Sequence, residues 1–360
     1  MDLSRRLVAP LSLGAAGLIL GAVAIGAATL GSGGDQFVPP PNPSATAAAP
    51  TPSPAPTGAI PVNVARDGPL PTPTPTPIPR AVAHCYSPRG EPPAGVVLQP
   101  ASERSIFRNC QVVAFYGYPS IPGLGVLGDK DPDAMTAQLR EQAEAYDATN
   151  GSRGVALAYH MIAAVAQGHS TADGTFLERI PHSVIDAYLE AAEQHDAIVI
   201  LDIQMGTSTV DAELEAIAPY LRHPRVHLAL DPEWHMPDGV TPGTQIGSMD
   251  AAEINRAQEI LQAVVDETGL PNKILVIHQF TRGMITNKGA IASYPGVDLV
   301  IDQDGFGYAG AKTGNYDVFV RQDGAEHGGM KIFYTEDFPP LITPAEANAL
   351  VPQPDLIVYQ

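Results

Sequence analysis

The 360-residue sequence contains only two cysteines, Cys85 and Cys110, and neither lies in a CxxC motif. The absence of that motif argues against a thiolate metal site or a catalytic thiol pair. In an oxidising compartment, two isolated cysteines pair more often than they stay free. We therefore expect a Cys85–Cys110 disulfide that holds the entry segment against the first strand.

Basic residues are also scarce, with 20 Lys and Arg against 39 Asp and Glu, so the formal net charge is −19. This excess of negative charge repels phosphate backbones, and we expect no nucleic acid partner. The sequence has no HExxH and no GxSxG motif, which disfavours a zincin-type metal site and a serine nucleophile. The glycine-rich segment 123–128 has the wrong spacing after the first apolar run for a dinucleotide-binding turn. We expect no cofactor.

The N-terminus carries the longest apolar stretch. Arg5 and Arg6 are followed by uncharged residues over 7–34, a stretch long enough to cross a bilayer. The flanking arginines place the N-terminus in the cytoplasm. We predict a single-pass membrane anchor over 1–34 with an extracytoplasmic domain. A cleaved signal peptide, and hence a secreted protein, is the alternative, because Ala22-Val23-Ala24 offers a small-residue cleavage site.

Residues 35–81 are rich in Pro, Thr and Ala and include the repeat PTPTPTP over 71–77. Such sequence cannot bury a core and favours an extended polyproline II conformation. We predict a disordered linker that acts as a stalk. The remaining segment, 82–360, has the size of one barrel domain, which we expect to be a monomer.

Short apolar runs alternate with amphipathic stretches throughout 82–360. The predicted strands are 112–116, 154–160, 197–202, 226–231, 273–278, 297–302, 331–334 and 355–359. The predicted helices are 133–150, 182–194, 210–221, 251–268 and 344–350. Near-continuous apolar runs are typical of parallel strands that are covered on both faces. The alternation predicts an α/β fold, a single (β/α)8 TIM-type barrel, with an open doubly wound sheet as the alternative.

The apolar runs share one further feature, a polar residue at or just after the end. These residues are Tyr116, Tyr118, His160, Asp202, Gln204, Asp231, Glu233, His278, Gln279, Asp302, Asp304, Glu336, Asp337 and Gln360. In a parallel barrel every strand delivers its carboxyl end to the same rim, where active sites lie. We therefore predict a functional pocket lined by acidic and polar groups at that rim.

The most informative motif is Leu230-Asp231-Pro232-Glu233-Trp234. Along a strand, side chains alternate, so Asp231 and Glu233 are expected on one side. Two like charges at short range raise the pKa of one carboxyl group, which gives a proton donor beside an ionised partner. An aromatic plate such as Trp234 suits the apolar face of a sugar ring. In the simpler alternative, Asp231 caps a turn and Glu233 is solvated.

This D-x-E at the end of the fourth apolar run resembles the motif of the barrel-fold N-acetylmuramidases, the family-25 lysozymes, and more loosely that of the chitinase-like barrels. The resemblance implies that Glu233 is a general acid and Asp231 its electrostatic helper. It also implies that Asp302 or Asp304 stabilises a charged intermediate. The lysozymes carry an Asp in their first strand, where this chain has Tyr116.

A second resemblance is to the large retaining-glycosidase clan, because Glu233 and Glu336 follow the fourth and seventh runs. That clan has Asn before its strand-four Glu, where this chain has Pro232.

These patterns predict an extracytoplasmic glycoside hydrolase that acts on a cell-envelope or extracellular polysaccharide. Glu233 is the expected general acid and Asp231 tunes it; the expected nucleophile or stabiliser is one of Asp302, Asp304 and Glu336. The expected sugar platforms are Trp234, Tyr116 and Tyr118. The expected hydrogen-bonding residues are His160, Asp202, Gln204, His278, Gln279 and Gln360.

Two other functions remain open at this point. A barrel of this kind can be a carbohydrate-binding or scaffold protein without activity. It can also be a metal-dependent hydrolase, with ligands drawn from His160, Asp202, Asp231, His278 and Asp302.

Overall fold

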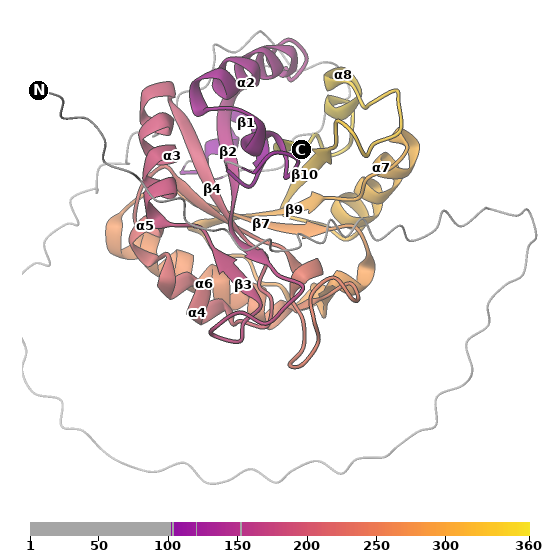
Figure 1. The fold of residues 1–360 in the computed structure, drawn as a ribbon. Helices are drawn as coiled ribbons and strands as arrows, with labels where there is room; N and C mark the ends of the chain where they lie inside the picture. The colour runs from indigo at the N-terminus through magenta and orange to yellow at the C-terminus, as the bar shows by residue number, and fades with distance from the viewer. Residues whose placement is uncertain (1–101, 103, 120, 152) are drawn as a thin grey trace, which may run out of the picture. The chain divides into compact units, whose positions relative to one another are not determined.

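Eight parallel strands close into a ring in the computed structural model, which describes residues 102, 104–119, 121–151 and 153–360 (Figure 1). In ring order the strands are β1 (Cys110–Gly117), β11 (Leu356–Tyr359), β10 (His327–Ile332), β9 (Val297–Gln303), β7 (Lys273–Gln279), β5 (Val226–Leu230), β4 (Ala197–Ile203) and β2 (Gly154–Ala166). Pairing of β1 with both β11 and β2 completes the closure. The predicted (β/α)8 barrel is confirmed, and the open sheet is excluded.

Helices on the chain between these strands cover the outside of the ring (Figure 1). They are α1 (Val126–Asp129), α2 (Pro132–Asp147), α3 (His182–His195), α4 (Val210–Ala216), α5 (Ala218–Leu221), α6 (Ala251–Thr268), α7 (Ala309–Tyr316) and α8 (Pro344–Asn348). Shorter 3-10 turns are η1 (Ile106–Arg108), η2 (Pro232–Trp234), η3 (Arg282–Met284) and η4 (Lys288–Ala290), and η5 (Asp317–Gln322) is a π-helix. The helix α6 matches its prediction because a capping box of Asp250 and Glu253 fixes its start.

The structure corrects several predicted boundaries. The expected helix 210–221 divides at Ile217 into α4 and α5, since Pro219 cannot supply a backbone donor to a continuous helix. The strand expected at 331–334 is β10, which begins four residues earlier. Its first half is hidden from a hydrophobicity pattern because it contains Gly328 and Gly329.

Some short elements were not predicted at all. The strand β2 runs on past its predicted end and pairs there with the antiparallel β3 (Leu177–Arg179). A small parallel pair is formed by β6 (Met249–Asp250) and β8 (Ile285–Thr286). The helix α7 contains Gly310 and Gly314, which lower its sequence signal.

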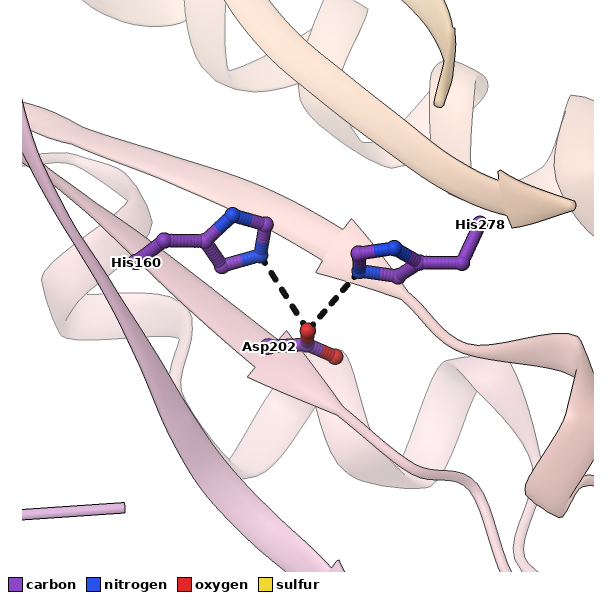
Figure 2. Close-up of side chains that lie close together, drawn as sticks. All are labelled: His160, Asp202 and His278. Atoms are coloured by element: carbon purple, nitrogen blue, oxygen red, sulfur yellow. Dashed lines mark hydrogen bonds and ion pairs between the residues drawn. The ribbon is translucent and has the colours of Figure 1, made fainter. Parts of the chain in front are cut away.

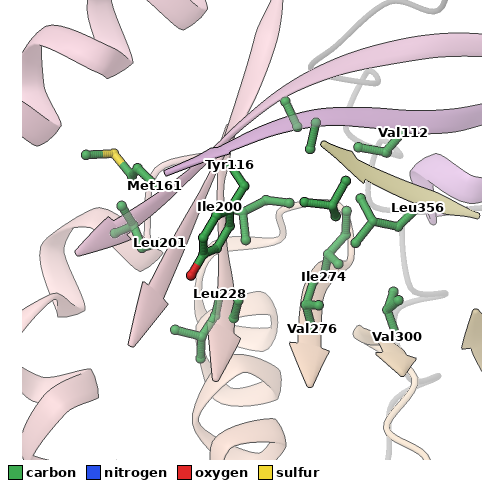
Figure 3. Packing of buried hydrophobic residues seen from close by; sticks show 14 of the residues in the cluster. Val112, Tyr116, Met161, Ile200, Leu201, Leu228, Ile274, Val276, Val300 and Leu356 are labelled. Atoms are coloured by element: carbon green, nitrogen blue, oxygen red, sulfur yellow. The ribbon is translucent and has the colours of Figure 1, made fainter. Parts of the chain in front are cut away.

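The core fills both the barrel interior and the layer between strands and helices. Figure 3 shows part of it, with Val112, Ile200, Leu228, Val276 and Val300 on different strands. All are fully buried. Burying one such side chain contributes about 1.5–3 kcal/mol. This two-sided burial explains why the strand sequences are almost continuously apolar.

At the amino ends of the strands, a buried polar network closes the barrel. Asp355 receives the Arg153 guanidinium on one carboxylate oxygen and the His327 Nδ1 on the other, the latter at 2.7 Å. Arg153 also donates to Gln353 at 2.9 Å. Each of these side chains is almost completely buried. The network joins β10, β11 and the residue before β2, and it is suited to a structural role.

The predicted anchor 1–34, the linker 35–81 and Cys85 all lie outside the described residues, so the predicted disulfide of Cys110 stays a prediction. Among the helices of the described residues, none is long and apolar enough to span a membrane.

We predict that Asp355→Asn destabilises the domain, because it leaves the buried Arg153 charge without its partner. Loss of one partner of a buried pair costs about 3–5 kcal/mol. Chemical unfolding followed by fluorescence measures the change. The control is Asp211→Asn, which removes the carboxylate of an exposed pair with Arg256 and is expected to leave the midpoint nearly unchanged. Equal midpoints for the two variants would contradict a structural role for the network.

Candidate active site

Three side chains from separate strands meet at the carboxyl end of the barrel interior (Figure 2). Asp202 Oδ2 lies 3.1 Å from His160 Nε2 and 3.0 Å from His278 Nε2. His160 is on β2, Asp202 on β4 and His278 on β7, and β5 separates the last two strands. Side chains of strands that are not neighbours can meet here only across the interior. All three are fully buried.

The second ring nitrogen of His278 faces two more carboxylates. His278 Nδ1 lies 3.2 Å from Asp302 Oδ2 and 3.2 Å from Asp304 Oδ2. Burial alone would lower the pKa of His278, but the charges of Asp202 and Asp304 raise it well above its ordinary value. Burial likewise opposes ionisation of Asp202, yet the two histidines lower its pKa. The surrounding carboxylates therefore favour the imidazolium form of His278.

Lys331 on β10 is the second cation of the site, and the sequence pattern did not predict this role. Its Nζ lies 3.0 Å from Asp304 Oδ1 and 3.8 Å from the centre of the Tyr116 ring. Burial opposes the charge of Lys331, but Asp304 and the neighbouring acids raise its pKa. Conversely, burial would raise the pKa of Asp304, whereas Lys331 and His278 lower it. Asp304 is held ionised by a cation on each oxygen.

Asp231 and Glu233 lie beside Asp304. The three side chains each offer a carboxylate oxygen, and these oxygens lie within 4.8 Å of one another. The predicted proximity is correct, but strand alternation is the wrong reason for it. The strand β5 ends at Leu230, and Glu233 belongs to the 3-10 turn η2. Asp231 accepts the Glu233 backbone N–H at 3.4 Å, so it caps that turn and also joins the acid group.

The acids of this group differ in their affinity for protons. Burial, and then the charge of Asp304, raise the pKa of Glu233 to about 7. Burial and the charge of Glu233 raise the pKa of Asp231 well above its usual range. Glu233 is the only one of the three that is half-buried rather than buried. A half-buried carboxyl group with a pKa near neutrality thus lies beside Asp304, whose pKa is lowered, and such a pair divides acid and base roles.

The side chain of Asp302 has room in the barrel interior because its partner residue on β10, Gly329, has no side chain. A Cβ on Gly329 would lie 2.6 Å from Asp302 Oδ1. Tyr116, which was expected to be a sugar platform, is 3 % exposed and packs edge-on against His160. Burial and the surrounding acids raise its pKa well above its ordinary value. Asp302 and Tyr116 therefore lie inside the cluster.

The remaining predicted site residues lie outside the group formed by Asp231, Glu233 and Asp304. Glu336 is exposed, in the turn after β10. Gln204 accepts the Ala166 backbone N–H at 2.9 Å, and Gln279 accepts the Lys288 Nζ at 2.7 Å. Tyr118 and Gln360 are at the same mouth of the barrel. Tyr118 is buried at its rim, where the pKa of its hydroxyl is raised by burial and by Glu178, and Gln360 is half-buried after β11.

Two groups have the donor types and spacing of metal ligands, namely His160, Asp202 and His278, and Asp231, Glu233 and Asp304. In the first group, both imidazoles face one oxygen of Asp202, and the free nitrogen of His278 faces two further carboxylates. In the second group, Lys331 already pairs with Asp304. The cations of the chain itself therefore provide charge compensation in both groups.

Comparisons with known proteins reveal no matching family model and no matching curated protein. Solved structures that match include a broad specificity endoglucanase (GH5-4) from Clostridium longisporum, with 8 % identity. The match covers 76 % of this chain and 85 % of that chain, with a TM-score of 0.36. A likeness of this size carries no argument about function, which rests on the site alone.

We predict that Trp234→Phe raises the pKa of Glu233 above about 7, because a hydrogen bond from the Trp234 side chain lowers that pKa. NMR titration of labelled glutamate carboxyl groups measures the shift. Tyr220→Phe is the control, since it removes a hydroxyl that bonds Asp186 at the surface. A Glu233 pKa that falls, or that does not move, in Trp234→Phe would contradict the assigned contact.

Proposed function

We propose that this protein is an extracytoplasmic glycoside hydrolase that cleaves a polysaccharide by carboxylate acid/base catalysis. One observation carries the proposal. The half-buried Glu233, with its pKa raised to about 7, lies beside Asp304, whose pKa is lowered by two cations. A proton donor next to an ionised carboxylate is the arrangement that hydrolysis of a glycosidic bond requires.

In the first step, Glu233 donates its proton to the glycosidic oxygen while the bond from that oxygen to the anomeric carbon breaks. A carboxylate oxygen of Asp304 bonds to the anomeric carbon and forms a glycosyl ester. In the second step, water attacks the anomeric carbon, Glu233 accepts a proton from that water, and Asp304 leaves as a carboxylate. The Glu233 and Asp304 side chains have carboxylate oxygens within 4.8 Å of each other, and short spacing suits this retaining course better than inversion, which needs wider spacing.

The remaining side chains prepare this pair. His278 and Lys331 keep Asp304 ionised, and Asp202 orients His278 through its Nε2. Asp231 has a pKa raised well above its usual range by burial and then by the charge of Glu233, which favours its neutral form. A neutral Asp231 reduces the negative charge close to Glu233. These four residues are positioning residues in this mechanism.

The location outside the cytoplasm belongs to the proposal and is supported by the sequence. The apolar segment 7–34 behind Arg5 and Arg6, followed by the Pro-rich linker, suits a domain held away from a membrane. A polysaccharide of the cell envelope or its surroundings is then the accessible substrate.

We predict that Glu233→Gln lowers the rate of hydrolysis about 10²–10⁴-fold, since loss of a general acid has effects of this size. Binding of oligosaccharides is expected to change little. Reducing-end assays on soluble glucan, xylan and chitin fragments measure the rate, and calorimetry measures binding. Glu336→Gln is the matched control, because Glu336 is exposed in the turn after β10, and it is expected to retain wild-type activity.

Two outcomes would overturn this assignment. Loss of activity in Glu336→Gln, with Glu233→Gln active, would move the acid to the other loop. Binding of glycans by the wild type without any cleavage would favour the carbohydrate-binding barrel.

We predict that chelators leave hydrolysis unchanged and that the purified protein holds far less than one metal ion per chain, because His278 and Lys331 already pair with Asp304. Elemental analysis and activity after dialysis against EDTA measure this. Activity that disappears with the chelator and returns with a divalent cation would instead support a metal-dependent hydrolase.

A further inference from the structure

Large aromatic side chains are exposed on the loops that follow β9 and β10. Phe306 is 54 %, Tyr308 65 % and Phe338 47 % exposed. The rings of Tyr308 and Phe338 lie 4.4 Å apart with an angle of 32° between their planes. We call Phe306, Tyr308 and Phe338 the aromatic rim. Exposed apolar groups that gather in this way usually mark a binding surface.

The loops that carry the aromatic rim are fixed by a buried ion pair. Asp337 Oδ1 accepts the Lys312 Nζ at 3.0 Å and the Gly307 backbone N–H at 2.9 Å. Its other carboxylate oxygen accepts the Phe333 backbone N–H at 2.9 Å. Gly307 in turn accepts the Phe338 N–H at 3.2 Å. A buried charge pair is costly to form, and here its effect is to hold exposed rings in one arrangement.

The aromatic rim borders the acid cluster. Phe306 follows Asp304 by two residues, and its ring packs edge-on against Phe333 with centroids 6.3 Å apart. The Phe333 ring lies 5.1 Å from Lys331 Nζ, which pairs with Asp304. A chain of contacts therefore leads from the exposed Phe306 ring to the carboxylate that lies beside Glu233. The loops after β9 and β10 both start at the carboxyl mouth of the barrel.

We propose that the outer, exposed faces of the Tyr308–Phe338 ring pair bind a pyranose residue of an uncharged glycan chain, outside the sugar that contacts Glu233. This inference rests on the proposed glycoside hydrolase function and adds a substrate class to it. The apolar C–H face of a pyranose stacks on aromatic rings. The net charge of −19 disfavours an anionic chain. The substrate is then a chain of several neutral sugars rather than a disaccharide.

Binding is measured first in the Glu233→Gln background, so that cleavage does not interfere. Calorimetry uses β-1,4-linked oligosaccharides of glucose, xylose and N-acetylglucosamine with two to six residues. We expect the double variant Tyr308→Ala, Phe338→Ala to bind the longest effective oligosaccharide about tenfold more weakly, the size of effect for one good stacking contact. The variant Tyr308→Phe, which keeps both aromatic rings, should retain most of the affinity of the Glu233→Gln protein. Val351→Ala, at an exposed apolar residue of the loop that leads into β11, is the control and should bind normally.

Kinetics in the active protein separate this role from a general loss of structure. For long substrates, the double variant should raise KM about tenfold with little change in kcat, whereas hydrolysis of short substrates should be unaltered. Unchanged affinity and KM in the double variant, with hydrolysis intact, would overturn the platform and leave the proposed function standing. Rim-dependent binding without hydrolysis by the wild type would overturn the proposed function and leave the platform.

A second occupant is tested in the same way. A synthetic peptide of residues 71–77 is titrated into the domain, because polyproline II segments also dock on exposed aromatic rings. Rim-dependent binding of this peptide, with no binding of any glycan, would overturn the sugar assignment in favour of the linker.

Discussion

The charge balance at the carboxyl end of the barrel interior controls the rest of this site. An isolated buried carboxylate is too costly to persist unless it is paired or protonated. His278 and Lys331 pair with Asp304, but the cluster holds more carboxyl groups than cations. Burial, and then the charges of the neighbouring acids, raise the pKa values of Asp231 and Glu233. The proposed general acid is thus a consequence of burial in a cluster that has few cations.

The two mouths of the barrel use the same residue types for different purposes. At the amino ends, Asp355 is matched by Arg153 and His327 in a buried network. At the carboxyl ends, Asp304 is paired with Lys331, and beside it lies Glu233, which is half-buried. Barrel enzymes place stability at the first mouth and chemistry at the second. The distribution of satisfied and unsatisfied charge in this chain follows that division.

Much of the barrel could be predicted because two-sided burial forces apolar runs, and the alternation with helices is visible except between β7 and β9 and between β9 and β10. What could not be predicted depends on contacts between distant residues. Lys331 stands in an apolar run, and only the fold shows that it meets Asp304. Gly329 gives no apolar signal because it has no side chain, and the same lack of a side chain leaves space for Asp302. The proximity of Asp231 and Glu233 was predicted from strand geometry, whereas a 3-10 turn produces it.

The depth of each carboxylate separates roles that the sequence left open among Asp302, Asp304 and Glu336. Asp302 is fully buried under the Gly329 backbone and supports His278 from within β9. Asp304, two residues further along the chain, lies just beyond the end of that strand and reaches the oxygens of Glu233. Glu336 is exposed in the turn that follows β10. The short distance between the Asp304 and Glu233 oxygens makes Asp304 the partner in the proposed chemistry.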